Sequence, residues 1–176
     1  AGALAGDAGI RDMKTQLARL TSTNLIDSGP VRTLADLGIS TNRDGTLALD
    51  TTALLSRFLE GPTRAAVLDA MSTDPDWCAS ALALSEALML VDRLGDDPGR
   101  TDELRRAIRD DWERIHVVPV DQMCLDRAAE LGRTQPVRTV DAIHLAAADR
   151  LPRPLTYVTF DPTQIPVALA LGFDVV

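Results

Sequence analysis

Four acidic side chains, far apart in the sequence, are the residues of this chain best suited to chemistry: Asp50, Glu86, Asp141 and Asp161. Carboxylate oxygens are the ligands that Mg²⁺ or Mn²⁺ prefers, and such an ion keeps several of its waters. A site of this kind activates water and stabilises the negative charge on a phosphodiester during hydrolysis. Metal-assisted hydrolysis is therefore the chemistry that these four residues would support if they meet.

Each acid also has a purely structural explanation. Asp50 precedes an expected helix and would cap it, and Asp141 in the first turn of a helix is favoured by the helix dipole. The run 161–164, Asp-Pro-Thr-Gln, is a good capping box, with an acid at the N-cap, Pro at N1 and Gln at N3. Taken singly, these three acids are best explained as caps. Glu86 differs because its neighbours in ALALSEALML are mostly apolar, so it needs either a function or a buried arginine partner.

The elements that must position these acids alternate between strand and helix. From Leu47 onward, short apolar strands and amphipathic helices follow one another, which predicts a mostly parallel sheet with helices on both faces. Ligands bind at the carboxyl ends of the strands in such a sheet, and the four acids are expected at that edge. The strands are expected at 47–49, 77–80, 115–120, 156–160 and 173–176, and the helices at 52–59, 64–71, 81–94, 104–112, 125–131, 140–150 and 164–171.

No other catalytic constellation competes with the acids. His144 lies three residues after Asp141 in the same expected helix and is better explained as a packed or hydrogen-bonded core residue than as a base. His116 begins a strand and has no evident partner. Cys78 and Cys124 have no metal-binding spacing, so we expect them to be reduced and packed.

The negative net charge of the chain argues against a nucleic-acid-binding function. The chain has a net charge of −8, and residues 47–176 hold 13 basic and 21 acidic side chains, whereas nucleic-acid binders usually carry the opposite sign. Divalent cations among the carboxylates would offset part of this charge. Four arginines near the acidic edge are candidates for contact with RNA: Arg57, Arg64, Arg133 and Arg138.

Composition also excludes several classes of protein. Lys14 is the sole lysine, so a phospho-accepting receiver domain, which also clusters acids at strand ends but needs a lysine near the last strands, is excluded. No apolar stretch is long enough to span a bilayer, and no basic leader precedes an apolar run. A cytoplasmic protein without membrane contact is expected.

The sequence resembles a known family from residue 47 onward. The pieces LALDTTALL (47–55), ALALSEAL (81–88), RTVDAIHLAAADRL (138–151) and YVTFDPTQIPVALALGFDVV (157–176) resemble PIN-domain ribonucleases, in particular the VapC toxins of bacterial toxin–antitoxin pairs. The resemblance implies a three-layer α/β/α sandwich with a five-stranded sheet and Mg²⁺- or Mn²⁺-dependent cleavage of RNA. It also implies inhibition by a cognate antitoxin protein, and dimerisation is an implied expectation.

The resemblance assigns a role to each acid. Asp50 and Asp141 would be the principal metal ligands, and Glu86 would complete the ligand set or accept a proton from water. Asp161 would support a second metal or its waters. Two hydroxyl residues would support the acids: Thr52 steadies the loop of Asp50, and Thr159 precedes Asp161 at the strand end. A non-catalytic α/β module that holds a protein or RNA partner is the alternative function.

Residues 1–46 have a different character. They resemble a fragment of a flagellar filament-cap (hook-associated) protein, with a helix expected at 10–21 and a hairpin joining strands 37–40 and 46–49. The helical stalk of such proteins is missing, which argues against a flagellar role for the whole chain. Because far more apolar area depends on the sandwich, we expect its first strand to prevail over the hairpin. The chain then divides into an N-terminal extension (1–46), peripheral or mobile, and a nuclease domain (47–176).

Overall fold

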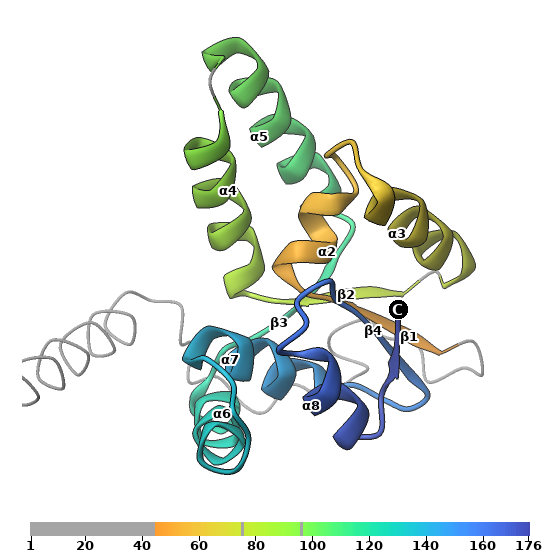
Figure 1. The fold of residues 1–176 in the computed structure, drawn as a ribbon, viewed down its shortest axis with the longest axis vertical. Helices are drawn as coiled ribbons and strands as arrows, with labels where there is room; N and C mark the ends of the chain where they lie inside the picture. The colour runs from red at the N-terminus through yellow and green to blue at the C-terminus, as the bar shows by residue number, and fades with distance from the viewer. Residues whose placement is uncertain (1–44, 75, 96) are drawn as a thin grey trace, which may run out of the picture.

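Five strands and seven helices alternate through the computed structural model, which describes residues 45–74, 76–95 and 97–176 (Figure 1). The strands are β1 (Thr46–Leu49), β2 (Trp77–Ser80), β3 (His116–Val118), β4 (Leu155–Val158) and β5 (Asp174–Val175). The helices are α2 (Thr51–Ser56), α3 (Pro62–Thr73), α4 (Leu82–Leu94), α5 (Pro98–Trp112), α6 (Gln122–Thr134), α7 (Thr139–Ala148) and α8 (Ile165–Ala170). The helix expected at 10–21, the strand at 37–40 and the extension to residue 44 lie outside the described residues.

The strands form one parallel sheet in the order β3-β2-β1-β4-β5. Helices α2 to α5 cover one face of the sheet and α6 to α8 cover the other (Figure 1). The predicted three-layer α/β/α sandwich with a five-stranded sheet is therefore confirmed.

Successive residues of β1 point into two separate cores. Leu47 and Leu49 pack in the apolar cluster beneath α2 to α5, whereas Ala48 packs in the cluster beneath α6 to α8. This follows from the two-residue repeat of a strand, and an apolar run without alternation is expected for a strand covered on both faces.

Strand β1 is hydrogen-bonded to parallel strands along both of its edges. Leu47 is in register with Trp77 of β2 and with Thr156 of β4. A hairpin partner for residues 46–49 would need one of those edges, so the expectation that the sandwich prevails over the hairpin is confirmed for these residues. The strand also begins one residue earlier than predicted, at the buried Thr46.

The ends of several elements differ from the prediction. Helix α5 begins at Pro98, six residues before the expected start, because Asp97 accepts a hydrogen bond from Gly99 N and proline suits the first turn of a helix. Strand β3 stops at Val118, just before Pro119, which has no N–H to donate to a ladder. Despite these shifts, Asp50 and Asp161 still follow the carboxyl ends of β1 and β4, and Asp141 still lies at the start of α7.

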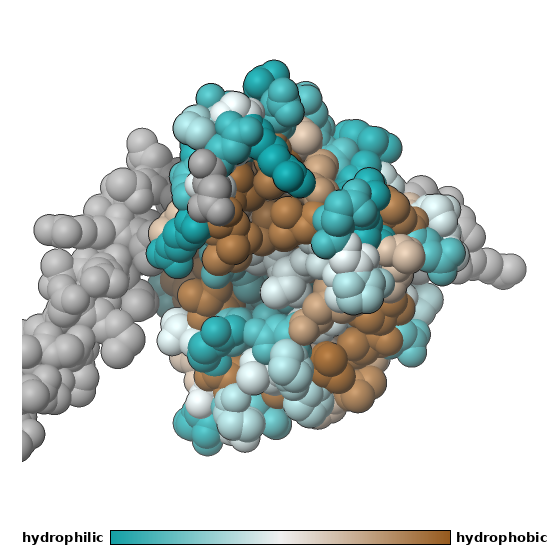
Figure 2. All heavy atoms as spheres, turned by 45° about the horizontal axis from the view of Figure 1, so that its top comes forward, coloured by the Kyte–Doolittle hydropathy of each residue, from teal (hydrophilic) through white to brown (hydrophobic). Residues whose placement is uncertain are grey.

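Apolar side chains are exposed on the face that carries α2 to α5. Figure 2 shows them gathered in a hollow among polar side chains. A groove between the end of α2 and the α4–α5 pair is lined by Leu59, Val91, Leu94 and Leu104. Among the described residues, no helix has the length and apolar character needed to cross a bilayer.

Candidate functional site

The four acids lie beyond the carboxyl ends of the central strands. Asp50 follows β1 and is the N-cap of α2. Asp161 follows β4, in the loop that leads to α8. Asp141 is in the first turn of α7, and Glu86 is in the second turn of α4. The topology therefore brings residues from both helical layers to one edge of the sheet.

Asp50 is fully buried, and several donors hold its carboxylate. Its carboxylate accepts hydrogen bonds from Thr52 Oγ1 at 2.7 Å, Ala53 N at 2.8 Å and Thr159 Oγ1 at 2.6 Å. Burial raises the pKa of Asp50 above its usual value, and these hydrogen bonds offset part of the effect. Asp50 caps the helix as its structural explanation requires, but Thr159 reaches it from the loop that follows β4.

Gln164 connects Asp50 to Asp141. Its amide Nε2 donates to Asp50 Oδ2 at 3.3 Å and to Asp141 Oδ1 at 3.1 Å. Ionised carboxylates only accept hydrogen bonds, so the NH₂ end of the amide faces them, and the hydroxyl of buried Tyr157 donates to Gln164 Oε1 at 2.6 Å. Two acids remote in sequence thus share one hydrogen-bond donor.

Arg138 connects Asp141 to Asp161. Its guanidinium donates to both oxygens of Asp141, at 2.6 and 3.1 Å, and to Asp161 Oδ2 at 2.6 Å. The Arg138 side chain is 72% exposed, so this cation approaches the acids from the solvent side. Burial raises the pKa of Asp161, but hydrogen bonds from Thr163 and the charge of Arg138 outweigh it and leave that pKa below the usual value.

Glu86 lacks the buried arginine partner considered from the sequence. Its side chain is one-third exposed, and its partners are Thr51 and His144 rather than an arginine. Thr51 Oγ1 donates to Glu86 Oε2 at 2.7 Å. Burial raises the pKa of Glu86, but the hydrogen bonds from His144 and Thr51 outweigh it, so the pKa lies below its usual value. Glu86 is therefore an ionised carboxylate at neutral pH.

The capping box proposed for residues 161–164 does not form. Helix α8 begins only at Ile165, and the Asp161 carboxylate accepts hydrogen bonds from the N–H and hydroxyl of Thr163. The Gln164 side chain turns inward to Asp50 and Asp141 instead of back to the first turn. A tertiary contact has prevailed over the local motif.

Thr52 and Thr159 both support Asp50. Thr52 Oγ1 also accepts a hydrogen bond from Phe160 N at 3.0 Å, which joins the first turn of α2 to the loop after β4. Thr159 Oγ1 accepts from Asp161 N at 3.2 Å while it donates to Asp50. The two hydroxyls hold Asp50 in place beside the loop of Asp161.

Pairs of acids share a donor, but they do not form a closed ligand set. In the described part of the chain, no three His, Cys, Asp or Glu side chains are grouped so that they could hold one metal ion. The cation at this edge is Arg138, which neutralises Asp141 and Asp161, and the Gln164 amide lies between Asp50 and Asp141. The donor chemistry, three carboxylates connected by a cation and an amide with Glu86 at the same edge, still fits a hard divalent ion.

One of the four candidate arginines contacts the acids. Arg138 does so directly, whereas Arg57 pairs with Asp111 and Arg64 pairs with Glu60. Arg133 is exposed in the last turn of α6. Arg138 is thus the arginine best placed to act at this site.

Three polar residues of the site were not predicted from the sequence: Thr51, Ser80 and Gln164. Thr51 directly follows Asp50 in the sequence, and Gln164 lies in the capping box that begins at Asp161. Their closeness in sequence to a predicted acid is the signal that could have identified them. His144 was expected to be packed or hydrogen-bonded in the core, and it is buried with hydrogen bonds at both ring nitrogens.

Neither cysteine takes part in the hydrogen bonds described for the four acids. Cys78 and Cys124 are free and buried, as expected. Burial raises the pKa of the Cys78 thiol to about 12 and that of Cys124 to about 11. Both thiols therefore stay protonated and unreactive at neutral pH.

Comparisons with known proteins match two overlapping parts of the sequence. The sequence profile described as the PIN domain matches residues 47–168. The profile described as the C-terminus of flagellar hook-associated protein 2 matches residues 1–74 and overlaps the first match. The chain is 30% identical over 130 residues to Ribonuclease VapC47 of Mycobacterium tuberculosis, which covers 71% of this chain and 91% of that protein.

Solved structures share the fold at low sequence identity. A toxin–antitoxin complex from Klebsiella pneumoniae aligns with a TM-score of 0.54 and 18% identity, covering 68% of this chain and 90% of that one. FitAcB from Neisseria gonorrhoeae aligns with a TM-score of 0.53 and 19% identity, covering 74% and 96%.

Proposed function

Because this chain belongs to the PIN-domain family, we propose that it is a Mg²⁺- or Mn²⁺-dependent endoribonuclease, the toxin of a type II toxin–antitoxin pair. The observation that carries the proposal is the single Gln164 amide shared by Asp50 and Asp141, since it brings together the two principal acids of the family pattern. The 30% identity to a ribonuclease over most of both chains supports the same activity. The cytoplasm, where RNA is present, is the proposed location.

Asp50 and Asp141 are the proposed principal ligands of the ion, and Asp161 is proposed to support a second ion or its waters. The metal supplies Lewis-acid stabilisation of charge on the phosphodiester and lowers the pKa of water. Hydrogen bonds from Thr52, Ala53 and Thr159 already fix the Asp50 side chain, so it needs little rearrangement to bind the ion. Such preorganisation is the protein's contribution to this chemistry.

Glu86 is the proposed acceptor of the proton that leaves the attacking water. Both of its hydrogen bonds end on Oε2, and Oε1 accepts none from the described residues. Its lowered pKa keeps it ionised, so Oε1 is available to take a proton or to complete the ligand set. Attack of that water on phosphorus would form one P–O bond and break the ester P–O bond to the leaving ribose oxygen, which would take a proton from solvent.

Removal of divalent metal is expected to abolish cleavage. The purified chain should cut single-stranded RNA with Mg²⁺ or Mn²⁺, should stop in EDTA, and should recover when the metal is returned in excess. Circular dichroism in EDTA should match that of the loaded protein, because the cores on both faces of the sheet do not depend on the ion. Cleavage that persists in EDTA would contradict the proposal, and a well-folded protein without cleavage would favour the alternative binding module.

Replacing Arg138 is expected to weaken RNA binding more than turnover. Arg138 is exposed beside the acids and can offer its guanidinium to a phosphate, while the overall charge of −8 repels RNA. Arg138→Gln should raise the dissociation constant several-fold and should reduce the slope of log affinity against log salt by about one. Fluorescence anisotropy with labelled RNA and metal-free protein in EDTA measures both without cleavage.

Arg133→Gln is the matched control, because Arg133 is also exposed but lies at the end of α6. It should leave the dissociation constant and the salt slope unchanged. Equal slopes for both variants and the parent protein would remove Arg138 from the RNA-binding surface.

A cognate antitoxin is the proposed protein partner. The fold is shared with chains titled as toxin–antitoxin complexes. The groove lined by Leu59, Val91, Leu94 and Leu104, together with Asp97, Arg100 and Thr101, is the surface that we propose for this partner.

A further inference from the structure

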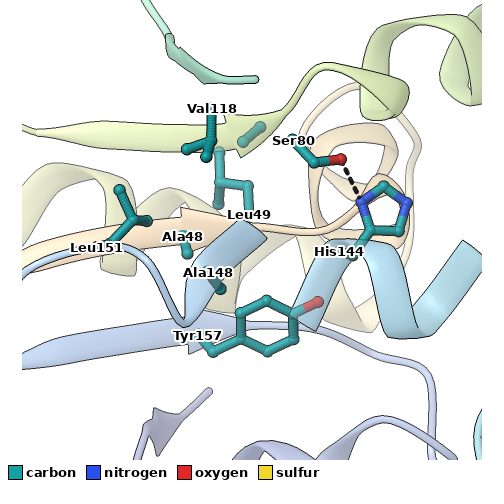
Figure 3. A pocket seen from close by; sticks show the side chains of 9 residues that line it. Ala48, Leu49, Ser80, Val118, His144, Ala148, Leu151 and Tyr157 are labelled. Atoms are coloured by element: carbon teal, nitrogen blue, oxygen red, sulfur yellow. Dashed lines mark hydrogen bonds between the residues drawn. The ribbon is translucent and has the colours of Figure 1, made fainter. Parts of the chain in front are cut away.

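His144 occupies a buried position that the proposed function leaves without a role. It lies on α7, one turn after Asp141, and its side chain is 2% exposed. It forms the polar end of a small cavity between α7 and the sheet, together with Ser80 of β2 (Figure 3). The other lining side chains are apolar apart from Tyr157, so both ring nitrogens depend on a few named partners.

Each ring nitrogen of His144 has a short hydrogen bond. Nδ1 lies 2.7 Å from Ser80 Oγ, on the side that faces the sheet (Figure 3). Nε2 lies 2.5 Å from Glu86 Oε2 and 3.2 Å from Thr51 Oγ1. The imidazole therefore connects the end of β2 to the carboxylate on α4.

The donor and acceptor at each nitrogen follow from the partners. An ionised carboxylate only accepts hydrogen bonds, so Nε2 must carry the hydrogen that lies between His144 and Glu86. The single hydrogen of the Thr51 hydroxyl also points to Glu86 Oε2. In a neutral ring Nδ1 is then an acceptor, and the Ser80 hydroxyl is its donor.

We propose that His144 is a positioning residue: as the Nε2–H tautomer, with Nδ1 anchored by Ser80, it orients the Glu86 carboxylate toward the metal edge. The inference rests on the proposed function, since it gives Glu86 a task there. With Oε2 fixed by His144 and Thr51, the free Oε1 is aimed in one direction. Partners of this kind, one step removed from a metal, typically change metal affinity about 10- to 100-fold when they are lost.

Two substitutions of His144 separate its two hydrogen bonds. The Gln side chain places an amide nitrogen at the ε position, so His144→Gln keeps a donor toward Glu86 and loses Ser80. The Asn side chain reaches only the δ position, so His144→Asn keeps Ser80 and loses Glu86. Both variants remove one ring and retain one hydrogen bond, which makes each the control for the other.

Calorimetric titration of the full chain with Mn²⁺ tests the proposal. His144→Asn should weaken Mn²⁺ binding about tenfold or more, and His144→Gln should stay within about threefold of the parent protein. Ser80→Ala should weaken binding to an intermediate degree, whereas Ser85→Ala, exposed on α4, should change nothing. Thermal unfolding in EDTA should give similar midpoints for the Asn and Gln variants, which excludes a general loss of structure.

The outcomes distinguish the inference from the function beneath it. Equal Mn²⁺ affinity in His144→Asn and His144→Gln would overturn the positioning role while leaving the metal site intact. A parent protein that binds no Mn²⁺ would instead refute the proposed function, and the role of Glu86 with it.

Nitrogen-15 NMR of the metal-free protein tests the tautomer without any metal. The chain has two histidines, so labelled histidine gives four ring-nitrogen signals, and His116→Gln identifies those of His144. A protonated Nε2 and an unprotonated Nδ1 are expected for His144, and Glu86→Gln, which replaces the acceptor-only carboxylate, should remove this strict preference. A protonated Nδ1 in the parent protein would overturn the inference.

Discussion

Asp141→Asn is expected to reduce metal-dependent RNA cleavage by about a thousandfold or more, because a ligand charge worth several kcal/mol to the transition state is lost. The fold should remain, since asparagine has nearly the same volume and its amide oxygen can still accept from Gln164 Nε2. The salt bridge to Arg138 would be lost, but Arg138 is largely exposed and retains Asp161. Single-turnover cleavage with saturating Mn²⁺ measures the effect.

Asp149→Asn is the matched control at the other end of the same helix. Asp149 accepts hydrogen bonds from Arg127 at 2.9 Å and Arg153 at 3.0 Å, so this substitution also removes a carboxylate paired with arginine. Its cleavage rate should equal that of the parent protein. If Asp141→Asn retained more than about a tenth of the parent rate, which is a loss below 1.4 kcal/mol, Asp141 would not be a principal ligand.

The fold and the edge that carries the acids could be predicted from the sequence because both follow from short-range patterns. The apolar run at 47–49 predicts a strand covered on both faces, and Leu47, Ala48 and Leu49 do alternate between two cores. Strand-helix alternation then predicts a parallel sheet, and parallel strands end at one edge. Asp50 and Asp161 were placed by that rule alone.

The partners of the acids could not be predicted, because they depend on tertiary packing. Residues 161–164 have the pattern of a capping box, yet Tyr157 donates to Gln164 and turns its amide to Asp50 and Asp141. Arg138 reaches Asp161 across a long stretch of chain. The packing of the helices on the sheet determines which side chains far apart in the sequence come into contact. No local sequence motif predicts those contacts.

Residues 47–74 show how packing decides between two sequence patterns. They match both the PIN-domain profile and the flagellar profile. In the structure Leu47 and Leu49 are nearly inaccessible and β1 is paired on both edges, so burial favours the sandwich. We still propose that an N-terminal extension ends at residue 46 and that the nuclease domain begins at residue 47.

Leu145→Ala is expected to lower the free energy of unfolding by about 3 kcal/mol, the middle of the range for a leucine cavity in a packed core. Leu145 is inaccessible to solvent at the centre of α7, a helix whose residues from Asp141 to Ala148 are all buried. Small alanines on this helix leave little side-chain bulk to collapse into the space. Urea unfolding in EDTA measures the loss, and Leu169→Ala, 56% exposed on α8, should change stability by less than about 0.5 kcal/mol.

The same variant connects the core to the metal site, because α7 carries Asp141 and His144 near its start. Metal that binds only the folded chain should return about 2.7 kcal/mol to Leu145→Ala at a hundred times the dissociation constant. That recovery should vanish when Asp141→Asn is added, since the stabilisation must pass through the ligands. Recovery of the same size in the double variant would mean that Mn²⁺ binds at another site on the chain. Asp141 would then not be a ligand of the ion.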